Sequence, residues 1–224
     1  MVWPGLTLTR QERHLLLHSP LLLDSLSSAI YGGGKGEIER IANIYVDRFY
    51  NCDHPEKDVE NLFQEWGYPL DSTAGLLTAV KLEHAAILEE KWEQASLFCC
   101  TTAGVSNGAR AGSKRSTFPV YQPGTINIMI MIDGRLTQAA MVNAVMTAVE
   151  AKSAALADLG IPDSENGLLA TGTTTDAIVI GVSQAASYDI EHRYCGTATD
   201  LGAAIGRVVY GTVQESLRVA GVTR

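Results

Sequence analysis

Residues 125–160 read TINIMIMIDGRLTQAAMVNAVMTAVEAKSAALADLG, and the fold class follows largely from them. The stretch from Thr125 to Ile132 is rich in β-branched residues, which is typical of a buried strand, and Asp133-Gly134 closes it with a turn. Thr137 can cap a helix, and the residues that follow, up to Leu159, are apolar almost all the way round. A buried strand followed by a long, covered helix predicts a sheet with helices packed on it.

The rest of the chain supplies further elements around this unit. Strands are predicted over residues 14–18, 21–30, 76–80, 97–105 and 177–182, with a turn at Ser19-Pro20 joining the first two. Helices are predicted over residues 37–50, 53–67 and 199–220, and residues 84–94 fit either a strand or a helix. Because no linker divides the chain, we expect one α+β domain over residues 1–224, with a mixed β-sheet layered against helices.

The composition is that of an ordinary globular protein. Apolar residues make up 46% of the 224 residues and charged residues 19%, which excludes a disordered chain. A chain of this length buries roughly 70% of its extended surface, so it needs neither disulfides nor metal to hold a core. Lys and Arg number 17 against 25 Asp and Glu, with no basic block, so we expect neither nucleic acid nor a membrane as a partner.

Cysteine usage and the N-terminal residues bear on the compartment. The four cysteines (Cys52, Cys99, Cys100 and Cys195) form no C-x-x-C motif, and adjacent Cys99 and Cys100 on a strand would point to opposite faces. The leucine-rich run over residues 15–23 contains His18 and Pro20, so it does not fit a secretory signal. We therefore expect a cytoplasmic protein with reduced thiols.

Polar residues within the long helix are the first candidates for chemistry. Asn143, Thr147 and Glu150 recur at spacings of four and three and share one face, whereas Lys152 projects from nearly the opposite side. Glu150 and Lys152 therefore cannot pair with each other. An enclosed carboxylate suits a general acid or base, and a salt bridge to another element is the structural alternative.

Two loops carry further polar residues. The loop ATGTTTD at 170–176 can present backbone N–H groups to an anion or oxyanion, and Asp176 could orient water there. Alternatively, its hydroxyls and Asp176 satisfy local backbone groups. In the segment TTAGVSN at 101–107, Asn107 could donate to a carbonyl or occupy a left-handed turn position. The sequence has no zinc spacing, H-E-x-x-H or G-x-S-x-G motif, so no metal site is expected.

Six strings, in this order along the chain, resemble the adenosylcobinamide amidohydrolase family of corrinoid salvage. They are LSSAI at 26–30, TAGVSNGARAG at 102–112, PGTINI at 123–128, EAKSAAL at 150–156, ATGTTTD at 170–176 and YCGTATDLG at 194–202. The resemblance implies hydrolysis of the amide that joins the corrin f side chain of adenosylcobinamide to aminopropanol. The corrinoid is then a small-molecule substrate rather than a cofactor. A metal requirement and a homo-oligomer are left open, and a non-catalytic corrinoid- or tetrapyrrole-binding module is the alternative function.

Residue chemistry within these strings suggests roles for amide cleavage. We expect Glu150 to act as general base and acid, Lys152 or Asp176 to orient or relay, and the 171–175 backbone to hold the oxyanion with Asn107 or Asn127. A covalent path through a hydroxyl of 171–175, for which no base is visible, is the alternative, and it makes Thr171 and Thr173 candidates. Substrate contacts are expected from Asn107, Arg110, Asn127, Gly172, Thr174 and Thr175. These roles require Glu150 and Asp176 to converge beside a corrin-sized hollow.

Overall fold

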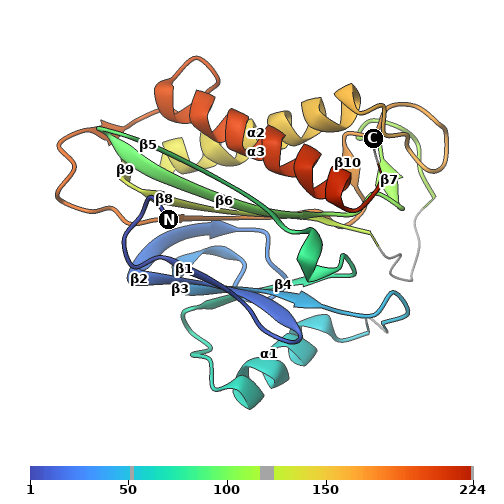
Figure 1. The fold of residues 1–224 in the computed structure, drawn as a ribbon, viewed down its shortest axis with the longest axis horizontal. Coiled ribbons are helices and arrows are strands. Elements are labelled where there is room, and N and C mark those ends of the chain that lie inside the picture. The colour runs from blue at the N-terminus through green and yellow to red at the C-terminus, as the bar shows by residue number, and fades with distance from the viewer. Residues whose placement is uncertain (51–52, 117–123, 223–224) are drawn as a thin grey trace.

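A computed structural model describes residues 1–50, 53–116 and 124–222. Its main feature is an eight-stranded mixed sheet with the strand order β4-β3-β2-β11-β8-β6-β5, in which β1 also pairs with β2 (Figure 1). The strands are β1 (Thr7–Arg10), β2 (His14–Ser27), β3 (Gly34–Tyr45), β4 (Thr73–Thr78), β5 (Ala86–Trp92), β6 (Ala95–Ala103), β8 (Ile126–Asp133) and β11 (Ala177–Val182).

Three α-helices and several short elements complete the described chain. The helices are α1 (Pro55–Trp66), α2 (Gln138–Asp158) and α3 (Asp200–Val219), with a 3-10 turn η1 (Leu82–His84). Two short ladders lie outside the main sheet, β7 (Gly108–Ala109) with β10 (Gly172–Thr173) and β9 (Arg135–Leu136) with β12 (Glu191–His192).

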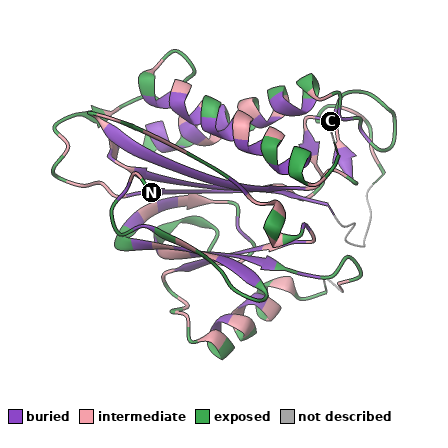
Figure 2. Cartoon of the chain, viewed as in Figure 1, coloured by how far each residue is buried: buried purple, intermediate pink, exposed green. Residues whose placement is uncertain are grey.

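The sheet folds over on itself, which creates four layers. On β8, Ile128 and Ile130 belong to a core that they share with α2 and α3, whereas Met129 packs in a second core with Leu17 and Leu23 of β2. A third core joins the outer face of β3 to α1. The order of layers is therefore α2 and α3, one half of the sheet, the other half, and α1 (Figure 1). Buried residues fill the strands between the helical layers (Figure 2).

The α+β class and the mixed sheet layered against helices are confirmed. The long helix begins after Thr137, whose side chain accepts a hydrogen bond from Ala140 N, as the sequence predicts. The predicted strand over residues 177–182 is β11, and the last predicted helix is α3 with Thr199 as its N-cap. The ambiguous residues 84–94 are mostly strand β5.

The predicted helix over residues 37–50 is wrong, because this segment lies mostly in strand β3. Ile38, Ile41 and Ile44 are three residues apart, which imitates a helical face. However, β3 lies between β2 and β4, with Ile41 packed toward the other half-sheet and Ile44 toward α1. A strand that is buried on both faces loses its period-two pattern, so periodicity alone cannot identify it.

The predicted turn at Ser19-Pro20 is also wrong. Residues 14–27 form one strand, and its register with β3 shifts between His18 and Leu23. Pro20 is exposed at this irregularity. Proline has no backbone N–H to donate, and β2 does not pair with β3 at this position, so proline is tolerated there. The expected pair of strands is therefore a single strand with a bulge.

Candidate functional site

Three segments that carry the predicted polar residues meet at one end of the sheet. Strands β8 and β11 run parallel with Asn127 opposite Ala177, so the residues that precede the two strands lie side by side. Strand β6 is antiparallel to β8 with Ala103 opposite Ile126, so the segment that follows β6 leaves at the same end. Sheet topology thus brings together loops that are distant in sequence.

Asp176 is the centre of this group. Its Oδ2 accepts hydrogen bonds from Lys152 Nζ and from Thr173 N at 3.0 Å, and its Oδ1 accepts from Thr173 Oγ1 and from Ile126 N at 3.0 Å. The side chains of Lys152 and Asp176 are only 8% and 12% exposed, so water screens this ion pair weakly. A carboxylate offers about four lone-pair sites, and these donors fill them, which fixes the orientation of the carboxylate.

Gly172 allows the Lys152 ammonium to reach Asp176 past the backbone. A Cβ atom on Gly172 would lie 2.4 Å from Asp176 Oδ2 and 2.7 Å from Lys152 Nζ. Both distances are shorter than any normal contact, so a side chain at position 172 would displace the ion pair. The predicted substrate contact Gly172 therefore has a packing reason in the structure.

Asn127 closes a buried polar network between the two halves of the sheet. Its Nδ2 donates both hydrogens, to Asn43 Oδ1 and to the Leu77 carbonyl, each at 2.8 Å. Asn43 Nδ2 in turn donates to Thr102 Oγ1 at 2.9 Å. Because the amide hydrogens of Asn127 are already used, Asn127 locks β8 to β3 and β4 and has none left for an oxyanion.

A cavity of about 190 Å³ lies beside Asp176. Drug-sized ligands occupy pockets of about 300–1,000 Å³, so this cavity suits one arm of a large substrate rather than a corrin ring. Its wall combines apolar residues with hydroxyl, amide and carboxylate groups, namely Ser28, Ile30, Pro55, Leu76, Leu77, Thr125, Asn127, Thr175, Asp176 and Ala177.

The threonines of the 171–175 loop serve different partners. Thr175 Oγ1 donates to the Gly124 carbonyl at 2.8 Å, and Thr174 Oγ1 accepts from Asn107 Nδ2 at 2.7 Å. Thr171 pairs with the backbone of Ala109 and Ala111 and is not among the residues that line the cavity. Of the predicted catalytic hydroxyls, Thr173 is therefore the one that contacts Asp176.

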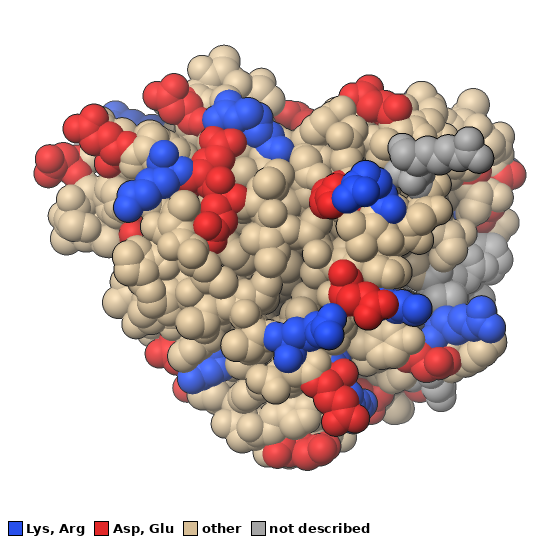
Figure 3. Space-filling model, viewed as in Figure 1, with Lys and Arg blue, Asp and Glu red and all other residues tan. Residues whose placement is uncertain are grey.

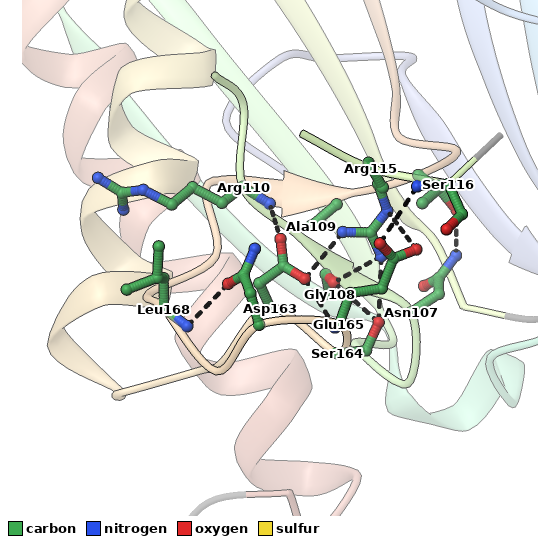
Figure 4. Close-up of polar contacts among 12 residues, drawn as sticks. Asn107, Gly108, Ala109, Arg110, Arg115, Ser116, Asp163, Ser164, Glu165 and Leu168 are labelled. Carbon is green, nitrogen blue, oxygen red and sulfur yellow. Dashed lines mark hydrogen bonds and ion pairs between the residues drawn. The ribbon is translucent and has the colours of Figure 1, made fainter. Parts of the chain in front are cut away.

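A second carboxylate, Asp163, organises the neighbouring loops (Figure 4). Its Oδ2 accepts from Arg110 N, and its Oδ1 accepts from Arg115 Nη1 and from Glu165 N, each at 2.8 Å. These hydrogen bonds, led by the one from the Glu165 backbone, hold the pKa of Asp163 at about 2. The Arg110 guanidinium bonds to the Leu169 carbonyl at 2.9 Å. Arg110 thus joins two loops and is not among the residues that line the cavity.

Glu150 does not reach the Asp176 cavity. It is exposed and lines a groove of about 500 Å³ between α2 and α3, together with Thr147. Two positions along a helix differ by about 200°, so the rotation of α2 that points Lys152 at Asp176 points Glu150 away. The expected convergence of Glu150 and Asp176 beside one hollow is therefore wrong. Within the described part of the chain Glu150 forms no ion pair either.

The sequence analysis does not single out Asn43 or Asp163. The pattern around Asn43 predicts a helix, which hides its place between the sheet halves, although an Asn among β-branched residues is itself a signal. Asp163 follows Pro162 in a segment that carried no motif.

None of the helices in residues 1–50, 53–116 and 124–222 is long and apolar enough to span a membrane. Over the same residues, no group of three or more His, Cys, Asp and Glu side chains could hold a metal ion.

Comparison with known proteins places nearly the whole chain within one family. A family model described as adenosylcobinamide amidohydrolase matches residues 5–221. The adenosylcobinamide amidohydrolase of Methanosarcina mazei is 30% identical over 195 residues, covering 84% of this chain and 88% of that protein. The adenosylcobinamide amidohydrolase of Halobacterium salinarum is 31% identical over 194 residues, covering 84% and 77%.

Two solved structures are similar in outline. The PH0078 protein of Pyrococcus horikoshii OT3 has a TM-score of 0.45 at 12% identity, covering 96% of this chain and 83% of that chain. A β-aminopeptidase from Burkholderia sp. has a TM-score of 0.46 at 10% identity, covering 95% and 81%.

Proposed function

The chain belongs to the adenosylcobinamide amidohydrolase family, and on this premise we propose that it hydrolyses the aminopropanol amide of adenosylcobinamide. The products would be adenosylcobyric acid and (R)-1-aminopropan-2-ol. The family match over residues 5–221 supports hydrolysis of an amide, and the small cavity beside Asp176, with its mixed apolar and polar wall, suits the arm that carries this bond.

The contact that carries the proposal is the one between Thr173 and Asp176. Thr173 Oγ1 donates to Asp176 Oδ1, while Lys152 Nζ holds Oδ2 of the same carboxylate. A hydroxyl nucleophile, a base within hydrogen-bond reach and a third group that orients the base form the usual arrangement for nucleophilic catalysis. Asp176 thus supplies the base that the sequence did not reveal for a covalent path.

In the proposed reaction, Thr173 Oγ attacks the amide carbon while its proton passes to Asp176. The Thr174 N–H, which has no acceptor among the described residues, donates to the resulting oxyanion. Collapse of the intermediate breaks the C–N bond, and Asp176 returns the proton to the departing amine. A water molecule then attacks the Thr173 ester while Asp176 accepts its proton. As the ester C–O bond breaks, Asp176 passes this proton to Thr173 Oγ, which releases the acid and restores the hydroxyl. Lys152 stays charged and keeps the carboxylate in place.

The first experiment is incubation with adenosylcobinamide and detection of both products by mass spectrometry. We expect adenosylcobyric acid and aminopropanol in equal amounts. Binding of adenosylcobinamide without either product would instead favour a non-catalytic corrinoid-binding module.

The nucleophile is tested separately by substitution. Thr173→Ala should lower kcat by at least about 100-fold, and Thr173→Ser, which keeps the hydroxyl, should retain a measurable part of it. Near-normal turnover by Thr173→Ala would remove the covalent step and leave direct attack by water.

A further inference from the structure

The corrin ring of the proposed substrate needs a surface that is continuous with the Asp176 cavity, because the cavity admits only one arm. Leu77 lines this cavity and also lines a larger hollow of about 660 Å³ near α1. The Leu77 carbonyl accepts the hydrogen bond from Asn127 at 2.8 Å, so the network at the site fixes the position of Leu77. The two spaces therefore share one lining residue, whose position the site itself fixes.

The hollow presents aromatic surface to solvent. Tyr45 and Phe49 line it and are 37% and 80% exposed. The Arg48 guanidinium lies 4.7 Å from the centre of the Phe49 ring, and Asp47 Oδ1 accepts from Phe49 N at 2.8 Å. With these contacts, the apolar Phe49 ring stays exposed on a short turn, although burying it would be favourable.

The charge of the hollow is negative. Asp47, Asp58 and Glu65 line it against one arginine, Arg13, and Asn61 adds an amide. Carboxylate and amide oxygens accept hydrogen bonds from primary amides, and carboxylates attract a cation. A corrinoid offers all three matching features, because it has an apolar ring, amide side chains around its edge and a cationic cobalt centre.

We propose that this hollow, lined by Tyr45, Phe49, Leu62, Leu77, Asp58 and Glu65, binds the corrin macrocycle while the aminopropanol arm enters the Asp176 cavity. The inference rests on the proposed function, since it identifies the substrate by that reaction. It adds a binding surface formed by the end of β3, the turn after it and α1, none of which the sequence motifs include.

The groove between α2 and α3 does not meet the requirement that the ring-binding surface adjoin the Asp176 cavity. It is about 500 Å³ and largely apolar, but it shares no lining residue with the Asp176 cavity. It also lies on the Glu150 face of α2, opposite the face from which Lys152 reaches Asp176. A ring bound there would leave its arm on the wrong side of the helix.

The test measures binding and turnover separately. Equilibrium dissociation constants for adenosylcobinamide are measured for the wild type, Phe49→Ala, Glu65→Gln and Tyr194→Ala. Tyr194 is the matched control, because it is an aromatic residue of 70% exposure that does not line the hollow. Phe49→Ala should weaken binding about tenfold and Glu65→Gln severalfold. Tyr194→Ala should bind as the wild type does.

The same measurements with cobinamide that lacks the adenosyl group identify which part of the ligand contacts the hollow. Equal losses for both ligands support the corrin ring, whereas a loss confined to the adenosyl form would overturn the assignment. If the wild type binds but does not hydrolyse adenosylcobinamide, the proposed function fails and the inference still stands on the binding losses. If the wild type hydrolyses it and both variants bind normally, the inference fails alone.

Discussion

Asp176 joins three parts of the chain through one carboxylate. It contacts Lys152 of α2, Thr173 of β10 and the backbone of Ile126 in β8. Of these donors, the Thr173 hydroxyl alone can give up its proton without breaking a backbone bond or an ion pair. The site therefore combines a rigid frame with one hydroxyl that is free to react.

The two acidic candidates, Glu150 and Asp176, differ in a measurable way. Asp176→Asn should lower kcat/KM for adenosylcobinamide by at least about 100-fold, because the base and the partner of Lys152 are both lost. Glu150→Gln should change it by far less, because Glu150 faces the outer groove. Steady-state kinetics of the two variants provide the comparison. Equal losses of kcat/KM in the two variants would show that Glu150 takes part in the reaction.

His14 makes stability depend on pH. It is buried, stacks on Trp66 with ring centres 4.0 Å apart, and its Nε2 lies 2.8 Å from the Tyr68 hydroxyl. Burial, helped by the nearby Arg13 charge, lowers the pKa of His14 to about 4, against 6.5 for an ordinary histidine. The unfolded chain therefore binds more protons between these values.

We expect the free energy of unfolding to fall as the pH drops from 6.5 to 4, with His14 contributing on the order of 2 kcal/mol. The contribution is fully present above pH 6.5. Urea unfolding across this range should show a smaller pH dependence for His14→Phe, whereas exposed His54→Gln should behave as the wild type. An identical pH profile for His14→Phe would contradict the assignment.

At the scale of elements, α2 carries Lys152 and is held at its start by Thr137. The Thr137 hydroxyl accepts from Ala140 N at 3.1 Å. Thr137→Ala should lower the free energy of unfolding by about 1 kcal/mol, and Thr137→Ser should restore most of it. Urea denaturation measures both. Equal stability of the alanine variant and the wild type would show that the cap contributes nothing.

The sequence predicts α2, α3 and the strands β8 and β11 well because each carries its own signal. Thr137 and Thr199 cap helices, and β8 is rich in isoleucine and closed by Asp-Gly. It fails for β3, whose pattern depends on burial by two other layers. Local sequence signals therefore predict an element when its own caps and residue pattern are enough to identify it.

The candidate site is predictable in its loops but not in its pairings. The sequence identifies the 170–176 loop and Lys152 as candidates, and helix geometry alone places Lys152 opposite Glu150 on α2. Which face of α2 meets Asp176 depends on how the helix rotates on the sheet. Asn43 pairs with Asn127, which is 84 residues away in sequence, so no local pattern predicts that contact.

Across the whole fold, the two adjacent cysteines of β6 lie on opposite faces of the strand and in different cores. Cys99 packs with α2 and α3, and Cys100 packs between the sheet halves, so the expected opposite orientation is confirmed. Both are free thiols, as is Cys195, whereas Cys52 lies outside the described residues. Burial raises the pKa of Cys99 to about 11 and of Cys195 to about 12, and raises that of Cys100 further.

These three thiols should report global unfolding. At pH 8 and without denaturant, Cys99, Cys100 and Cys195 should alkylate at least about 100-fold more slowly than in urea, because only the exposed thiolate reacts. Peptide mapping of the alkylated protein gives the rate at each residue. Rapid labelling of Cys99 in the folded protein would contradict the packing of α3 on β6.

The surface charge is consistent with recognition at a local site. On the face in Figure 3, acidic and basic side chains lie in small mixed groups, with a broad uncharged area between them. No extended field of one sign covers this face.

The most direct test of the account is a single measurement on the Thr173–Asp176 pair. Adenosylcobinamide is mixed with excess wild-type protein, the reaction is stopped with acid, and the intact protein mass is recorded over time. We expect a transient species heavier by the adenosylcobyric acyl group, localised to Thr173 by peptide mapping and missing in Thr173→Ala. Steady release of product with no acylated protein at any time, or acylation at another residue, would contradict it.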